Sequence, residues 1–267
     1  MPIGARQRSL KGGAAMTAAL AISIAPETVQ SEPLRERVQV LESRPGVHQV
    51  LLVSEGSPYQ RAAQHAVIVL GGGGGGFAVT SRDGLPRVNG GLPLSQRERL
   101  ANAIGGAVVA LSPPTDHPVM DRSWRMSNDH VADMQTAVHW TKREWPNVQT
   151  WMLGLNNGAL SAAVATASID DLAGAVLLSC VDEALDQPQK SERMRVLAVR
   201  HCADRAASAV HARGRKTLVT VHDERHPRRE AVHDDAVIAA QFSGKEQQVV
   251  DVVARWILTG TAPDEIR

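Results

Sequence analysis

Residues 151–163 constrain the fold of this chain more than any other stretch. An apolar segment leads into Gly154, a second glycine follows at Gly158, and a run of small residues comes after it. This is the layout of an apolar strand that turns tightly into a helix, with the residue midway between the two glycines projecting from the bend. That residue is Asn156. We therefore expect a strand, a sharp turn at Asn156 and a helix of small residues.

Short apolar runs, each typical of a strand buried on both faces, recur along the rest of the chain. They occupy residues 65–70, 107–111, 148–153, 173–178, 196–199 and 217–221. Before them, two further strand patterns at residues 38–42 and 47–53 predict an antiparallel hairpin, because Pro45 and Gly46 supply the turn between them.

Helical patterns alternate with these strands. The spacing of apolar residues predicts helices over residues 94–104 (opening at Ser95), from a cap at Ser127 or Asn128 to Pro146, over 159–167 and over 245–258. The alternation predicts an α/β protein with a mainly parallel central sheet of about eight strands, helices on both faces and an N-terminal antiparallel hairpin. Segments 79–93, 112–126 and 223–244 are rich in Pro, Gly or charge and are predicted to be loops around a binding crevice.

The composition limits the kinds of partner. The chain has 267 residues of which 43% are apolar, enough for one domain, which we place at residues 37–260 with a short tail at 261–267. Lys plus Arg number 29 and Asp plus Glu 28, so a net charge of +1 gives no electrostatic basis for binding nucleic acid or an anionic membrane. Beyond the N-terminal region, no stretch approaches the roughly 20 apolar residues of a membrane span.

Residues 1–36 have the pattern of either a secretory signal or a disordered tail. Basic residues precede an Ala-rich apolar run that ends in small residues, as in a signal peptide. This pattern is compatible both with export and with a cytoplasmic location. Cys180 and Cys202 each follow an apolar strand, so they could lie near each other and pair after export, or stay as free thiols in the cytosol.

Six short segments occur in a characteristic order along residues 37–260. They are Arg-Pro-Gly-Val at 44–47, the glycine run at 71–76, residues 110–116, the 154–158 turn with Ser-Ala-Ala at 161–163, His-Cys-Ala-Asp at 201–204, and Phe-Ser-Gly-Lys-Glu at 242–246. No single segment is specific, but their order is. In this order they resemble the α/β-hydrolase family, in particular a bacterial, often exported branch of serine hydrolases. The resemblance implies the α/β-hydrolase fold with Asn156 at the nucleophile elbow.

The resemblance places the three catalytic positions of such hydrolases at Asn156, Ala240 and Asp204. A neutral amide is not a nucleophile that an adjacent base can activate, Ala240 stands where the histidine is expected, and only Asp204 retains its acid. Loss of either the serine or the histidine role costs several orders of magnitude in rate. Ser161, five residues beyond the elbow, is expected to pack against the sheet. We therefore expect a pseudoenzyme that binds a small carbonyl or carboxylate ligand, or a partner protein, through the former active-site pocket.

The glycine run at residues 71–76 is the candidate binding element. Consecutive N–H groups without side chains can bind an anion or a carbonyl oxygen, and in the family this loop supplies part of the oxyanion hole. We expect Gly72, Gly73 and Gly74, with the N–H of Asn157, to contact the ligand; the alternative is a merely flexible connection. No Gly-Lys-Ser/Thr and no dinucleotide fingerprint follows the run, and no cofactor is expected.

Histidines supply the remaining candidates. His117 lies on a loop that relatives place beside the pocket and could contact the ligand. His233, or else His226, could take the vacant histidine position beside Asp204, which would make the chain an active enzyme: a hydrolase with a rearranged site, or a lyase or isomerase that uses a His/Asp pair. The alternative is that their loop is solvated charged surface. No metal site is expected there, because Pro227 interrupts the helical His spacing and no third ligand is fixed.

Overall fold

The structure is a computed structural model that describes residues 35–56, 64–82, 85–89, 91–180, 182–202, 216–222, 242 and 244–267. Residues Glu32–Arg267 form one compact unit. Within the described part of this unit, no helix is both long enough and apolar enough to cross a membrane.

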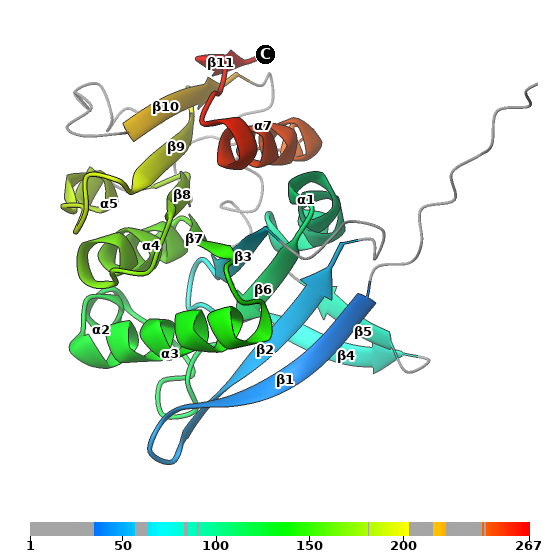
Figure 1. Cartoon of the computed structure of the whole chain (residues 1–267), viewed down its shortest axis with the longest axis vertical. Coiled ribbons are helices and arrows are strands. Elements are labelled where there is room, and N and C mark those ends of the chain that lie inside the picture. Colours follow the sequence, from blue (N-terminus) through cyan, green and yellow to red (C-terminus); the bar gives the residue numbers. More distant parts are fainter. Residues whose placement is uncertain are drawn as a thin grey trace, which may run out of the picture. The chain divides into compact units, whose positions relative to one another are not determined.

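A nine-stranded sheet runs through the unit in the order β1-β2-β6-β3-β7-β8-β9-β10-β11 (Figure 1). Its members are β1 (Arg35–Arg44), β2 (Val47–Glu55), β3 (His65–Leu70), β6 (Ala107–Leu111), β7 (Gln149–Leu155), β8 (Gly174–Leu178), β9 (Arg195–His201), β10 (Lys216–Val221) and β11 (Glu265–Ile266). Every neighbouring pair from β6 to β11 is parallel, whereas β1–β2 and β2–β6 are antiparallel. The predicted architecture of a mainly parallel sheet with an N-terminal hairpin is confirmed.

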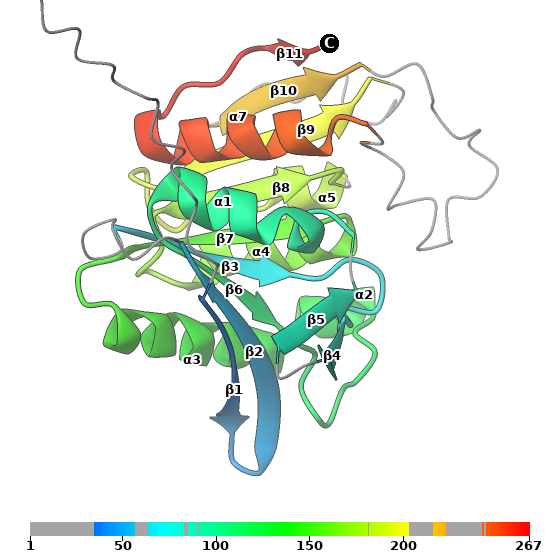
Figure 2. The ribbon, with the colours of Figure 1, turned by 90° about the vertical axis from the view of Figure 1, so that its right-hand side faces the viewer.

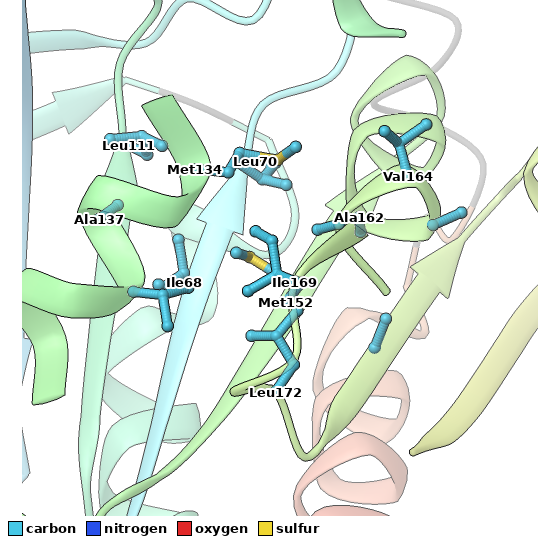
Figure 3. Close-up of a cluster of buried hydrophobic side chains, with 14 of the residues drawn as sticks. Ile68, Leu70, Leu111, Met134, Ala137, Met152, Ala162, Val164, Ile169 and Leu172 are labelled. Atoms are coloured by element: carbon cyan, nitrogen blue, oxygen red, sulfur yellow. The ribbon is translucent and has the colours of Figure 1, made fainter. Parts of the chain in front are cut away.

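Helices cover both faces of this sheet, which confirms a second part of the prediction. α3 (Asn128–Glu144) and α4 (Asn157–Ser168) pack on one face, and α1 (Arg97–Ile104) and α7 (Glu246–Thr259) pack on the other (Figure 2). Figure 3 shows the core beneath α3 and α4, where Met134 and Ala162 of the helices meet Met152 of β7. Each strand contributes side chains to the cores on both faces of the sheet, because successive side chains point to opposite faces. In β3, Ile68 packs in the core beneath α3 and α4, and Val67 packs in the core beneath α1 and α7.

The ends of the long helix α3 agree with the sequence. The Ser127 hydroxyl caps it by accepting a hydrogen bond from the His130 N–H at 3.1 Å, and Pro146 follows the C-cap residue Trp145. The helix predicted over residues 94–104 is corrected at its start. Residues Leu94–Gln96 form a short 3₁₀ turn, and the α-helix begins only at Arg97.

Two segments predicted as loops contain regular structure, and those predictions are wrong. Residues 79–93 include β4 (Ala78–Arg82) and β5 (Leu85–Asn89), which pair with each other in a separate two-stranded sheet. The sequence does carry a hairpin signal there, the dipeptide Asp-Gly at positions 83 and 84. Residues 112–126 include the four-residue helix α2 (Arg122–Arg125), where the Asp121 carboxylate accepts a hydrogen bond from the Trp124 N–H at 2.7 Å.

Two other short elements were not predicted. The helix α5 (Asp182–Asp186) follows β8. Residues 261–267, expected as a tail, include β11, which pairs in parallel with β10 as the last strand of the sheet. Neither α5 nor β11 contains the continuous apolar run by which five-residue strands such as β6 and β8 are recognised in sequence.

Candidate functional site

The bend after β7 holds Asn156 at its tip. β7 ends at Leu155, α4 begins at Asn157, and Asn156 between them has φ 52° and ψ −115°. Its N–H donates to the Leu178 carbonyl of β8 at 2.8 Å, and its carbonyl accepts from the Ala159 N–H at 2.9 Å. Positive φ is uncommon outside glycine and is best tolerated by Asn and Asp, and such backbone strain clusters at functional sites. The Asn156 side chain is half-buried and makes no capping hydrogen bond to α4.

The two glycines that flank Asn156 allow three backbone segments to touch. A Cβ at Gly154 would lie 2.0 Å from the Gly158 carbonyl oxygen, and a Cβ at Gly158 would lie 2.3 Å from that of Leu70. Real Cβ atoms do not approach oxygen this closely, so any larger residue would force the backbones apart. The Gly-x-x-x-Gly spacing therefore brings the first turn of α4 against the carboxyl ends of both β7 and β3.

The glycine run begins directly beyond β3 and lies against this bend. The Gly75 N–H donates to the Gly72 carbonyl at 2.7 Å and closes a turn in which Gly73 and Gly75 have φ 49° and 88°. A Cβ at Gly72 would lie 3.0 Å from the Leu155 carbonyl oxygen and 3.9 Å from the Asn156 Cβ. The loop and the elbow, predicted to act together from sequence, are thus in contact. Within the described residues, the N–H groups of Gly72, Gly73 and Gly74 have no hydrogen-bond acceptor.

Arg125, which was not among the predicted site residues, binds two carbonyl groups of the glycine loop. Its side chain comes from α2 and is fully buried. Nη1 donates to the Ser161 hydroxyl at 2.9 Å, and Nη2 donates to the carbonyl oxygens of Gly71 at 3.1 Å and Gly73 at 2.9 Å. Burial lowers the pKa of Arg125 to about 10, so the guanidinium is charged at neutral pH. Ser161 is buried, as predicted, and is engaged by this cation.

His130 lies in the same interior and is held neutral. Its ring is 1% exposed, and neither ring nitrogen has a hydrogen-bond partner among the described residues. Burial, with smaller effects from the charges of Arg125 and Arg44, lowers the pKa of His130 to about 3. Arg125 and His130 therefore place a buried guanidinium and a neutral imidazole in the same interior.

His117 is exposed and stacks on a tryptophan. Its ring lies 3.6 Å from the Trp124 ring, centroid to centroid, with the planes 6° apart. The Arg44 guanidinium lies 5.3 Å from the same Trp124 ring. Val119, which is 72% exposed, connects this loop to the glycine run, because a Cβ at Gly74 would lie 3.1 Å from the Val119 Cγ1. The predicted contact between His117 and a ligand stays a prediction.

The comparisons with known proteins bear on the fold. No protein-family model and no curated protein matches the chain. Solved structures do match it. A fungal esterase from Rhizomucor miehei has 12% sequence identity and a TM-score of 0.53, and the match covers 86% of this chain and 84% of that one. An esterase from the hyperthermophilic archaeon Pyrobaculum calidifontis has 14% identity and a TM-score of 0.54, and the match covers 85% of this chain and 84% of that one. An α/β serine hydrolase without a lid from Xanthomonas campestris has 15% sequence identity and a TM-score of 0.50, and the match covers 86% of this chain and 98% of that one. This chain has the α/β-hydrolase fold.

Several residues that were predicted to complete the site of this α/β-hydrolase fold lie outside the described part of the chain. They are Asp204, His226, His233 and Ala240. Within the part that is described, no three His, Cys, Asp or Glu side chains come together as a metal site. His222, the one histidine of the 222–233 group that is described, has its Nε2 3.7 Å from the Glu265 carboxylate of β11.

A thiol and an imidazole meet at the carboxyl end of β9 in this α/β-hydrolase fold. The Cys202 Sγ lies 4.0 Å from Nδ1 of His201, which is buried, whereas Cys202 is exposed. Cys180 follows β8, the parallel neighbour of β9, so the two cysteines lie at the ends of adjacent strands.

A cavity of about 420 Å³ lies at the opposite end of the parallel strands from Asn156. It is lined by residues at the amino ends of β7 and β9, among them Thr150 and Arg195, and by the Lys142–Asp171 ion pair. Because Asn156 and the glycine run lie at the carboxyl ends of β7 and β3, this cavity is separate from the candidate site.

Proposed function

We propose that this α/β-hydrolase-fold protein is a pseudoenzyme that binds a small carbonyl or carboxylate ligand above Asn156. The observation that carries the proposal is the position of Asn156. It occupies the tip of the strand-to-helix bend, with φ 52°, beside a loop of N–H donors. In a serine hydrolase the attacking hydroxyl projects from such a bend. An amide at that point can donate and accept hydrogen bonds but cannot attack a carbonyl.

The surroundings of Asn156 support binding without cleavage. Gly72 and Gly74 can donate N–H groups to a ligand oxygen, as an oxyanion hole does. The N–H of Asn157 at the start of α4 adds a donor and the positive end of a helix dipole. By resemblance, the histidine that would activate a nucleophile is replaced by Ala240. In this proposal the backbone donors that bind the ligand are therefore retained, and the nucleophile and the histidine that would cleave it are lost.

An assay of the purified full-length protein with p-nitrophenyl acetate and a fluorophosphonate tests this proposal. We expect hydrolysis no faster than in buffer and no covalent adduct by intact-protein mass spectrometry. The fluorophosphonate reports directly on an activated serine, wherever it lies in the chain. An adduct on any serine would overturn the pseudoenzyme proposal.

An active thiol enzyme of the same fold is the second candidate. The contact of 4.0 Å between the Cys202 Sγ and the His201 Nδ1 favours it, because an adjacent imidazole can activate a thiol as a nucleophile. Any ester hydrolysis that persists after fluorophosphonate treatment but disappears in Cys202→Ser would favour this candidate. In the pseudoenzyme proposal Cys202→Ser changes nothing, because there is no turnover to lose.

A further inference from the structure

Arg125 is a buried cation whose hydrogen bonds, within the part of the chain that the structure describes, all go to neutral groups. Its side chain is 0% exposed, and its three bonds reach the Ser161 hydroxyl and the carbonyl oxygens of Gly71 and Gly73. Among the described residues, its Nε has no partner and no carboxylate lies within ion-pair distance. A charge taken out of water is costly unless an opposite charge lies nearby.

The other charges of this interior leave the Arg125 charge uncompensated. His130 is neutral at physiological pH, because its pKa is lowered to about 3. The charge of Arg44 is already compensated, because its guanidinium forms ion pairs with the carboxylates of Asp133 at 2.8 Å and Asp116 at 3.0 Å. Among the described residues, the fully buried cation therefore has no counter-charge on the protein side of the glycine loop.

The hydrogen bonds from Arg125 also fix the direction of two peptide groups. In a trans peptide the C=O and N–H bonds point in opposite directions. Because the guanidinium holds the carbonyls of Gly71 and Gly73, the N–H groups of the same peptides, those of Gly72 and Gly74, point away from it. Gly72 lies against Leu155 and Asn156, which places this part of the loop beside the elbow, whereas Gly74 lies against Val119.

We propose that the pocket above Asn156 selects a carboxylate over a neutral ester or amide, and that Arg125 is the positioning residue behind this preference. This inference rests on the proposed function and names its ligand class. A carboxylate bound to the N–H groups of Gly72 and Gly74 would lie across two peptide units from the guanidinium and would supply the missing counter-charge. A neutral carbonyl could accept the same hydrogen bonds but would leave the buried charge uncompensated.

The wild-type protein tests the preference through two ligands of equal shape. We would titrate the full-length, ¹⁵N-labelled protein with butyrate and with butyramide and obtain both dissociation constants from amide chemical shifts. Butyrate is expected to bind at least about tenfold more tightly, a difference of roughly 1.4 kcal/mol. Equal binding of the two ligands would overturn the inference and leave the proposed function standing. Binding of neither ligand would overturn the proposed function itself.

Arg125→Met tests whether this arginine is the source of the preference. Methionine keeps much of the side-chain volume without the charge, and we expect butyrate to lose about tenfold in affinity while butyramide changes by less than threefold. Arg99→Met is the matched control, because it removes the same charge from the surface pair that Arg99 makes with Asp251. It should leave both constants unchanged. Equal weakening of both ligands in Arg125→Met would reduce Arg125 to a structural role and contradict the inference.

Arg125→Lys keeps the test decisive if Arg125→Met does not fold. A lysine retains the charge but cannot hold two carbonyls and a hydroxyl with the planar guanidinium geometry. We expect both ligands to bind more weakly, while the preference for butyrate persists at least about tenfold. A folded Arg125→Lys protein that binds butyrate and butyramide equally would contradict the role of the charge.

Discussion

The Asp133 carboxylate, which is completely buried, accepts hydrogen bonds from Arg44 at 2.8 Å from Nε and 3.2 Å from Nη2. The Ser43 hydroxyl donates to the same carboxylate at 2.6 Å. These bonds join the end of β1 to the middle of α3, elements that lie about ninety residues apart in the chain. The side chain of Arg44 is only 17% exposed, so the pair is shielded from water and salt.

Removal of the Asp133 carboxylate should therefore destabilise the fold strongly. Asp133→Ala leaves Arg44 partly buried without its closest acid, and breaking a buried pair in this way costs about 3–5 kcal/mol. Asp129→Ala is the matched control, since Asp129 lies 3.7 Å from the same guanidinium but is 60% exposed, and it should cost less than about 1 kcal/mol. Urea unfolding measures both variants. Similar losses from the two would refute the role given to the buried pair.

His130 should make the stability depend on pH. The unfolded chain takes up a proton on this histidine below about pH 6.5, whereas in the folded protein the pKa is lowered to about 3. The unfolded state therefore binds more protons between these values. Stability is full above pH 6.5 and falls by up to about 1.4 kcal/mol for each pH unit below it.

His130→Phe isolates this effect because it keeps a ring and removes both unpartnered nitrogens. Free energies of unfolding in urea at pH 7, 6 and 5 should fall less steeply for this variant than for the wild type, by roughly 1 kcal/mol per pH unit near pH 5. Carboxylates contribute equally to both proteins and cancel in the comparison. Parallel pH profiles would show that His130 titrates alike in the folded and unfolded chains.

Gly158→Ala should disrupt the elbow. Its Cβ would lie 2.3 Å from the Leu70 carbonyl oxygen and 2.7 Å from that of Gly71, so β3 and α4 must move apart, at a cost of about 1–3 kcal/mol or more. Gly76→Ala is the control, because a Cβ there meets nothing within 4 Å and should change stability by less than about 0.5 kcal/mol. Thermal unfolding followed by circular dichroism distinguishes them. An unchanged melting temperature for Gly158→Ala would contradict the close packing of α4 against β3.

Restoration of the missing groups should recover weak ester hydrolysis. The resemblance to serine hydrolases predicts that Asn156→Ser with Ala240→His hydrolyses p-nitrophenyl acetate at least about tenfold faster than the wild type, while either single variant stays at background, because the two groups act as a unit. The initial rate of p-nitrophenol release measures this. A folded double variant with no activity would contradict the mapping of Ala240 to the histidine position.

The sheet and the elbow could be predicted from sequence because local patterns specify them. Continuous apolar runs such as β3 mark buried strands, and glycines spaced like Gly154 and Gly158 mark the tight turn around Asn156. The short elements β4, β5 and α2 were missed because none of them contains a continuous apolar run. The buried position of Arg125 could not be predicted either. Arginine is usually exposed, and the carbonyls that satisfy Arg125 lie more than fifty residues away in the chain.

Binding without cleavage above Asn156 is tested most directly by one NMR experiment on the ¹⁵N-labelled, full-length protein. Methyl butyrate is added first and its own signals are followed, and butyrate is then titrated into the same sample. Methyl butyrate should stay intact, and butyrate should shift the amide signals of Gly72, Gly74 and Asn157 until they saturate. Release of methanol from the ester, or butyrate-induced shifts that leave these three amides unchanged, would contradict the account.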